Sequence, residues 1–209
     1  MTTTGFITRC WTRRAEGLRR LALAFFLLVA GFGPARAETV EITQLRVERG
    51  DDGVLLSAQV RFDLPLAIDD ALAKGVPMFF VAEAVLYQDR WYWYDKRVAG
   101  AARHMKLSYQ PLTRRWRLQV SSMPIGNSGL TLGQSYDSRE EALAAIQRFA
   151  QWRIAEPGEI DPDARYNVDF KFRLDVSQLP RPFQIGTLGQ SDWSLSAARN
   201  QRVPAEGAR

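Results

Sequence analysis

The sequence is almost without the residues that build disulfides, thiolate metal sites and histidine-based catalysis. Its 209 residues include one cysteine, Cys10, and one histidine, His104. A single cysteine forms no disulfide within the chain, and one histidine without thiolates does not make a tetrahedral zinc site with nitrogen and sulfur ligands. We therefore predict no metal site, and a fold that depends on a hydrophobic core.

The motifs of common enzyme and nucleotide-binding classes are also absent. The sequence has no G-x-S-x-G, no dinucleotide fingerprint and no glycine loop ending in Gly-Lys-Ser/Thr. Two acidic stretches, "RGDDG" and "EPGEIDPD", lack the D-x-D-x-D-G spacing of a calcium loop. We predict a non-enzymatic protein with no cofactor and no catalytic residue.

The first 37 residues have the layout of a secretory signal peptide. Arginines precede an apolar run over residues 21–33, and the small residues Ala35 and Ala37 stand before Glu38. The alternative is a retained membrane anchor, but the apolar run is shorter than the roughly 20 residues that a spanning helix needs. We predict cleavage between Ala37 and Glu38 and a periplasmic location.

Removing this leader changes the charge of the protein. Six of the 28 Lys and Arg residues and one of the 23 Asp and Glu residues lie in the leader, which leaves 22 of each sign. The formal net charge of +5 therefore falls to zero. Without a basic balance there is no electrostatic reason to expect a nucleic-acid partner.

The rest of the chain has mostly strand-like patterns. "YNVDFKFRLDV" alternates apolar and polar residues, which predicts a strand with one wet face, and "RGDDG" separates two strands as a hairpin loop. Helices are predicted within residues 64–75 and 137–150, the second with Asp137 and Glu140, or Ser138 and Glu141, as a capping box. The predicted fold is mainly β: one domain over residues 38–198, an antiparallel sandwich or strongly curved sheet of about eight strands with two short α-helices. Residues 199–209 are predicted to be a disordered tail.

An unbroken aromatic row, "WYWY" at residues 91–94, follows Gln88 and Asp89. If those two residues form a hairpin turn, the tryptophans face alanines of the preceding strand and belong to the core, and Tyr94 lies opposite Glu83. The other face is then a candidate for partner or ligand binding, made of Tyr92, Tyr94, Glu83, Lys96 and Arg97. The alternative is that both tyrosines are half-buried, with only their hydroxyls at the water boundary.

Three other features are weaker candidates. The proline-bearing "SQLPRPFQI" suits an extended docking segment. "LTRRWRL" is either a basic and aromatic patch for an anionic partner or a strand with Trp116 inward and Arg115 and Arg117 outward. Glu83 and Asp95 are adjacent across the hypothetical hairpin, so they provide a carboxylate pair for a hydrolase, or simply salt bridges to Lys96, Arg97 or Arg103.

Several segments in fixed order resemble a known family. These are "KGVPMFFVAEAVLY", "DRWYWYDKRVA", "LSYQPLTRRWRL", "SREEALAAI" and "YNVDFKFRLDVSQLPRPFQI" followed by "DWSLS". Together they are similar to a proteobacterial family of exported proteins of unknown function, sometimes labelled proline-rich signal peptide proteins. The resemblance covers nearly the whole chain after the leader and carries no catalytic residues. It implies an envelope role linked to a membrane-bound sensor kinase, because such proteins are encoded beside two-component systems.

These observations lead to three functional hypotheses. The first is an exported periplasmic protein that binds an envelope protein, and that meets the membrane only through an uncleaved leader or a membrane-bound partner. The second is a module that binds cell-wall glycan with the same tyrosines, since aromatic faces are suited to stacking. The third is a hydrolase that uses the carboxylate pair.

Overall fold

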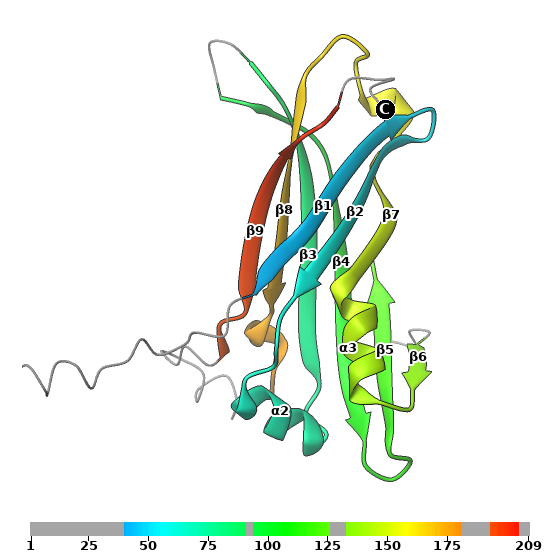
Figure 1. Ribbon diagram of the computed structural model, residues 1–209, viewed down its shortest axis with the longest axis vertical. Helices are drawn as coiled ribbons and strands as arrows, with labels where there is room; N and C mark the ends of the chain where they lie inside the picture. The colour runs from blue at the N-terminus through cyan, green and yellow to red at the C-terminus, as the bar shows by residue number, and fades with distance from the viewer. Residues whose placement is uncertain (1–39, 91–93, 126–132, 181–192, 205–209) are drawn as a thin grey trace, which may run out of the picture. The chain divides into compact units, whose positions relative to one another are not determined.

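Two antiparallel sheets face each other in the computed structural model, which describes residues 40–90, 94–125, 133–180 and 193–204 (Figure 1). The smaller sheet has the order β1-β2-β7 and the larger has the order β6-β5-β4-β3-β8-β9. The strands are β1 (Glu41–Gly50), β2 (Gly53–Arg61), β3 (Met78–Gln88), β4 (Lys96–Gln110), β5 (Arg115–Ser121), β6 (Gly133–Tyr136), β7 (Arg148–Ala155), β8 (Tyr166–Leu174) and β9 (Ser196–Arg202). The predicted mainly β, antiparallel sandwich is confirmed.

The alternating sequence of β8 divides cleanly between core and solvent. Phe170 and Phe172 are fully buried, while Lys171 and Arg173, which follow each of them, are exposed. β3 is different, because its first five residues are all buried. It lies between β4 and β8 near the centre of the larger sheet, and from Glu83 onward its outward-facing residues are only half-buried.

Stacked aromatic rings join the two sheets. The ring of Phe62, which follows β2, lies 5.3 Å from that of Phe172 and 5.7 Å from that of Phe80, between ring centroids. Phe149 on β7 meets Phe170 edge to face at 5.5 Å. Offset and edge-to-face pairs at such distances add to the free energy already gained by burying the rings. The contacts fix the smaller sheet over the middle of the larger one.

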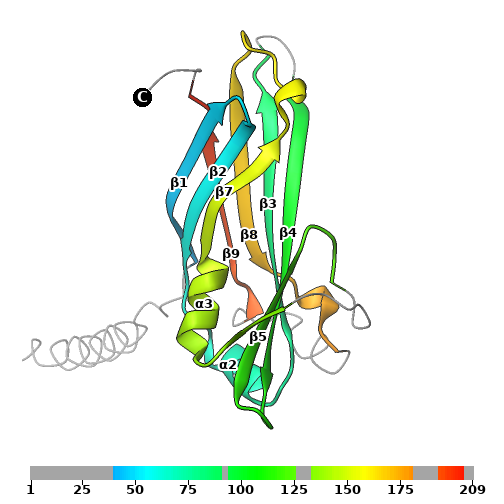
Figure 2. The ribbon, with the colours of Figure 1, turned by 90° about the vertical axis from the view of Figure 1, so that its right-hand side faces the viewer.

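Two short α-helices cover the part of the larger sheet that the smaller sheet does not reach (Figure 2). They are α2 (Leu66–Ala73) and α3 (Arg139–Gln147), and two 3-10 turns, η1 (Pro157–Glu159) and η2 (Val176–Gln178), complete the elements. Ser138 caps α3 by accepting a hydrogen bond from the Glu141 backbone N–H at 3.2 Å, as the second capping alternative predicted. No helix in the described part of the chain is long and apolar enough to cross a bilayer.

An arginine bridges each side where the two sheets meet. On one side the Arg103 guanidinium lies 5.0 Å from the ring centroid of Trp152 and 5.6 Å from that of Phe149. Burial there lowers the pKa of Arg103. On the other side Arg199 donates to the backbone carbonyl of Ile42 at 2.9 Å. Long arginine stems thus cover apolar edges, while their heads reach aromatic faces or backbone oxygens.

Several predicted boundaries were wrong. The second helix ends at Gln147, and residues 148–150 begin β7, so Phe149 packs from a strand. The predicted disordered tail is incorrect for residues 199–204, because β9 continues to Arg202 by pairing with β8, and Val203 is buried. Backbone pairing at a sheet edge does not require apolar side chains, so composition alone missed this strand.

The β1–β2 turn gives a test of backbone conformation with a built-in control. Gly53 has φ +94°, and a Cβ there would lie 2.2 Å from the Ala155 carbonyl oxygen, whereas a Cβ at Gly50 meets nothing within 4 Å. Gly53→Ala is expected to lower the free energy of unfolding by at least about 2 kcal/mol. Gly50→Ala is expected to change it by less than about 0.5 kcal/mol. Urea denaturation measures both, and equal effects would contradict the turn geometry.

The aromatic contacts between the sheets predict a large stability loss at Phe172. Phe172→Ala removes a fully buried ring that contacts three other rings, and is expected to cost about 3–5 kcal/mol. Leu112→Ala is the control, since Leu112 is fully exposed in the β4–β5 turn, and is expected to stay within about 0.5 kcal/mol of the unmodified protein. A small effect of Phe172→Ala in the same denaturation assay would show that these rings do not join the sheets.

Candidate functional site

The β3–β4 connection differs from the predicted hairpin. Gln88 pairs with Lys96, so residues 89–95 connect the strands, and Glu83 lies opposite Ala102 rather than Tyr94. The predicted turn at Gln88 and Asp89 was therefore wrong. A two-residue turn favours Gly or Asn at positions of positive φ, and neither residue is present there. Trp91, Tyr92 and Trp93 lie outside the described residues, so the buried tryptophans and the role of Tyr92 stay predictions.

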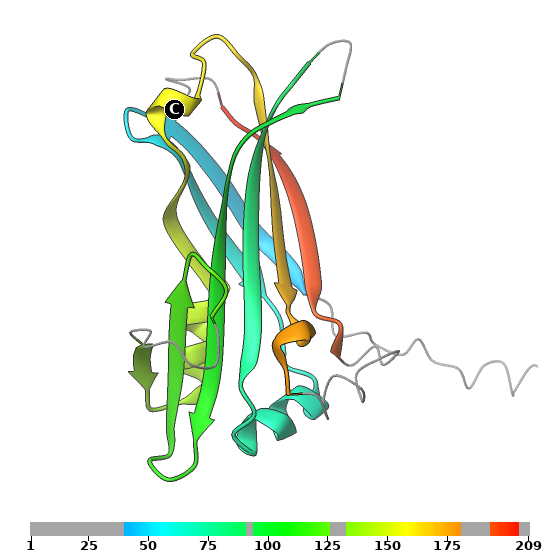
Figure 3. The ribbon, with the colours of Figure 1, turned by 180° about the vertical axis from the view of Figure 1, so that it is seen from behind.

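Tyr94 is almost completely exposed. Its relative accessibility is 93%, and Asp95, Lys96 and Arg97 after it are exposed as well. The half-buried interpretation is therefore incorrect for Tyr94. We call residues 89–90 and 94–97 the arm, because the ends of β3 and β4 lean away from the β1–β2 hairpin here (Figure 3).

The root of the arm is held firmly against β8 and β9. The Asp89 carboxylate accepts a hydrogen bond from the Asn167 side chain and forms an ion pair with Arg202 at 3.2 Å. The Asp89 backbone N–H also donates to the Arg165 carbonyl at 2.9 Å. Three contacts on one residue fix the direction in which the arm leaves the sheet.

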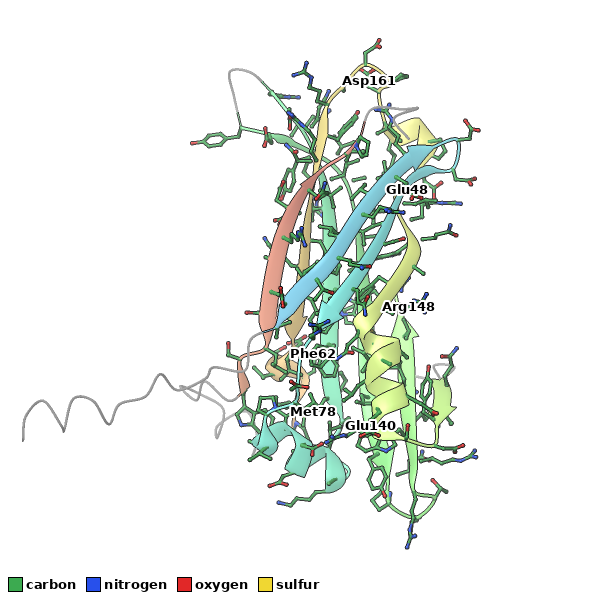
Figure 4. The ribbon with its side chains drawn as sticks, viewed as in Figure 1. Glu48, Phe62, Met78, Glu140, Arg148 and Asp161 are labelled. Carbon is green, nitrogen blue, oxygen red and sulfur yellow. The ribbon has the colours of Figure 1, made fainter. Side chains whose placement is uncertain are left out.

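A pocket of about 290 Å³ lies beside this root, lined by arginines and one aromatic ring. Arg49 lies over the Tyr166 ring at 5.7 Å and donates to the Asp161 carbonyl at 2.9 Å. Arg165 and Arg202 complete the cationic lining. Figure 4 shows Asp161 at this end of the sandwich and Glu140 toward the opposite end. The arm and the pocket together make this end rich in arginine.

The two carboxylates proposed as a hydrolase pair do not meet. Glu83 lies five residues before Gln88 on β3, whereas Asp95 precedes Lys96, the partner of Gln88. The five residues from Glu83 to Gln88 alone span about 17 Å at roughly 3.4 Å per residue, and Asp95 lies beyond that pair. Glu83 instead forms an ion pair with Arg173 on β8 at 3.3 Å. The predicted adjacency was wrong because it depended on the shorter turn.

The described part of the proline-bearing segment "SQLPRPFQI" is not an extended strand. Residues 176–178 form η2 rather than an extended strand, Leu179 is buried, and residues 181–185 lie outside the described residues.

His104 is on β4, opposite Val81 and Ser121, and its Nδ1 atom is buried without a hydrogen bond in the described part of the structure. Neither this histidine nor the proline-bearing segment contributes to the arm.

A second surface feature lies at the opposite end, between α2, α3 and the β4–β5 hairpin. We call it the helix groove, a cavity of about 430 Å³ lined by Asp69, Ala73, Tyr109, Arg114, Trp116, Asp137, Ser138 and Arg139. Tyr109 and Trp116 are cross-strand partners, with ring centroids 4.9 Å apart and planes tilted by 40°. Both rings are half-buried and form the aromatic part of the lining.

Charged side chains around the helix groove are held by ion pairs. Arg139 at the start of α3 contacts Asp69 on α2 at 2.6 Å, and Arg115 contacts Asp137 at 3.1 Å. The hydrogen bond with Asp69 is the main cause of the raised pKa of Arg139. Arg114 forms no ion pair with another described residue, and its backbone has φ +54°, which is strained for a side chain with a Cβ.

Sequence reasoning found only half of the helix groove. The sequence pointed to the basic and aromatic patch around Trp116, and its second interpretation holds for the exposed Arg115, whereas Arg117 is half-buried like Trp116. Asp69 and Arg139 were missed, because they lie far from Trp116 in sequence and meet only through the packing of two helices. Among the described residues, no group of three His, Cys, Asp or Glu side chains is arranged to hold a metal ion.

Comparison with known protein families identifies the family of this chain. The profile of a domain of unknown function, DUF4390, matches residues 37–202. No curated protein and no solved structure matches the chain. The match covers both the arm and the helix groove.

The Asp69–Arg139 pair predicts a small, salt-sensitive stabilisation of the helix groove. Asp69→Asn is expected to lower the free energy of unfolding by about 0.5–1 kcal/mol, with the loss smaller at high salt, because both side chains are about one-third exposed. Because the pKa of Arg139 is raised, its charged form is stabilised at every pH below the ordinary arginine pKa. A change of pH in the usual range therefore does not switch the ion pair off, whereas salt weakens it.

Asp70→Asn provides the matched control. Asp70 is the next residue on α2, is exposed, and forms no ion pair with another residue in the described ranges. Denaturation in low and high salt should show little change for this variant. Equal losses for the two variants would mean that the pair with Arg139 contributes no specific stabilisation.

Proposed function

The chain belongs to the DUF4390 family of unknown function, and on that premise we propose that it is an exported, non-enzymatic domain that binds an envelope protein through the arm. The observation that carries this proposal is the 93% exposure of Tyr94 at the end of a firmly anchored hairpin. Tyrosine and arginine are enriched among the residues that contribute most binding energy at protein interfaces.

The anchoring of Asp89 makes the arm suited to binding. A segment that is already ordered loses less conformational entropy when a partner arrives, so more of the contact energy appears as affinity. Here the ion pair with Arg202 and the hydrogen bond from Asn167 order the root before binding. The exposed tyrosine is therefore presented from a fixed base.

The charge of the arm favours an acidic partner surface. Arg90, Lys96 and Arg97 are exposed, against the single exposed carboxylate of Asp95. Three arginines line the pocket at the root, against the carboxylate of Asp163 and the ion pair of Arg202 with Asp89, which leaves an excess of positive charge there. Complementary charge raises association rates and selects partners, so an acidic protein surface is the expected counterpart.

The place of action is proposed to be the periplasm, from the signal-peptide pattern of residues 1–37 with its small residues Ala35 and Ala37 before Glu38. These residues lie outside the described part of the chain. The periplasmic region of a membrane-bound sensor kinase is the specific partner that the family resemblance implies. The alternative is cell-wall glycan, for which the same exposed Tyr94 offers a stacking face.

In-cell photo-crosslinking tests this function. A photoreactive amino acid is placed at position 94 of the full-length protein, and the adduct is identified by mass. One discrete protein adduct is expected, and its identity tests the sensor-kinase link. Position 46 on β1 is the control, because the Arg46 side chain is 78% exposed but lies on the other sheet.

The same adduct from both positions, or no adduct from position 94 of a folded and exported protein, would contradict binding through the arm. Cross-linked cell-wall material from position 94 alone would instead support the glycan alternative. Arg97→Gln extends the test, since loss of an interface cation should weaken the adduct more at low than at high salt.

A further inference from the structure

The helix groove is a gap in the helical cover over the larger sheet. α2 contributes Asp69, the start of α3 contributes Ser138 and Arg139, and the sheet contributes Tyr109 and Trp116. A volume of about 430 Å³ is in the range of small-molecule sites, which combine aromatic surface with a few fixed polar groups. The helix groove therefore has the size and composition of a site for a small ligand or for one unit of a polymer.

The polar groups in the helix groove still have free hydrogen-bonding capacity after the ion pairs have formed. Each ion pair leaves carboxylate oxygens of Asp69 and Asp137 able to accept hydrogen bonds, and Arg139 able to donate them. A ligand with several hydroxyl groups donates and accepts at once, so it fits this mixture. The ion pairs also hold the side chains in position before a ligand arrives, which lowers the entropy cost of binding.

The aromatic and charged parts define the ligand further. A pyranose ring presents apolar C–H faces that stack on the flat surfaces of Tyr109 and Trp116. Arg114 beside them has no acidic partner among the described residues, and a guanidinium binds a carboxylate with two parallel hydrogen bonds. The Arg114 backbone, at φ +54°, is strained, and conformational strain of this kind is concentrated at functional sites.

We propose that the helix groove binds a carboxylate-bearing saccharide. Its ring stacks on Trp116, its carboxylate pairs with Arg114, and its hydroxyls bond to Asp69 and Asp137. A phosphate ligand suits the site less, because it offers acceptors only and its greater negative charge is repelled by those two aspartates. The proposal is independent of the arm, which lies at the other end of the β4 strand.

Two matched sugar pairs test the proposal by NMR titration of the purified protein. They are N-acetylmuramic acid with N-acetylglucosamine, and glucuronic acid with glucose; the acid of each pair carries a carboxylate that its partner lacks. The Trp116 indole N–H signal, assigned with Trp116→Phe, is the reporter. At least one acid is expected to bind about tenfold or more tighter than its neutral partner. Which acid does so distinguishes a cell-wall sugar from a uronic acid as the source.

Variants separate the roles within the site. Arg114→Gln is expected to abolish the preference for the acid, Arg114→Lys to keep part of it, and Arg46→Gln, on the other sheet, to keep all of it. For the ring, Trp116→Phe is expected to retain binding and Trp116→Ala to lose it. Both variants lack the indole reporter, so binding is read from the backbone N–H signals of Ser138 and Arg139, and unchanged backbone signals far from the helix groove show an intact fold.

Three results would overturn the proposal. One is equal binding of acid and neutral sugars. Another is no shift of the Trp116 signal at about 20 mM of any of the four, a concentration that corresponds to very weak binding. The third is an acid preference that persists in Arg114→Gln. Failure here leaves the cross-linking result at position 94 unaffected, so the two proposals stand or fall separately.

Discussion

The packing of aromatic rings between the sheets is the constraint on which the rest of this structure depends. The only cysteine, Cys10, cannot cross-link the sandwich within one chain, so the sheets are joined without a disulfide, mainly by buried rings. Phe62 and Phe149 from the smaller sheet side meet Phe172 from β8, and each ring contacts more than one other. These contacts determine where a three-stranded sheet sits on a six-stranded one.

The two candidate surfaces lie at opposite ends of the sandwich and have different origins. Three strands do not cover six, so α2 and α3 complete the cover at one end and leave the helix groove between them. At the other end β3 stops at Gln88, which pairs with Lys96 at the start of β4 and with Tyr166 at the start of β8. Tyr94 lies beyond these last pairs and is exposed. The helix groove is thus a gap between the two helices that cover the larger sheet, and the arm is the end of the β3–β4 hairpin.

Features that depend on neighbouring residues were predicted well, and those that depend on register were not. The alternation in β8 and the Ser138 cap of α3 follow from local sequence, and both are confirmed. The turn between β3 and β4 was placed too early, which put Glu83 opposite Tyr94 and suggested a carboxylate pair with Asp95. A register error of this kind moves every cross-strand contact, because partners on two antiparallel strands shift together.

The sequence by itself determined the class of fold, the alternation that separates core from surface, the family, and the lack of disulfide chemistry. These follow from composition and from periods of two and 3.6 residues, which act over a few positions. Only the tertiary structure decided that Asp89 is anchored by Arg202, that residues 199–202 form a strand, and that Asp69 meets Arg139 beside Trp116. Such contacts join residues far apart in the chain. They form only when whole elements pack together, and the free energy of that packing cannot be read from a local sequence pattern.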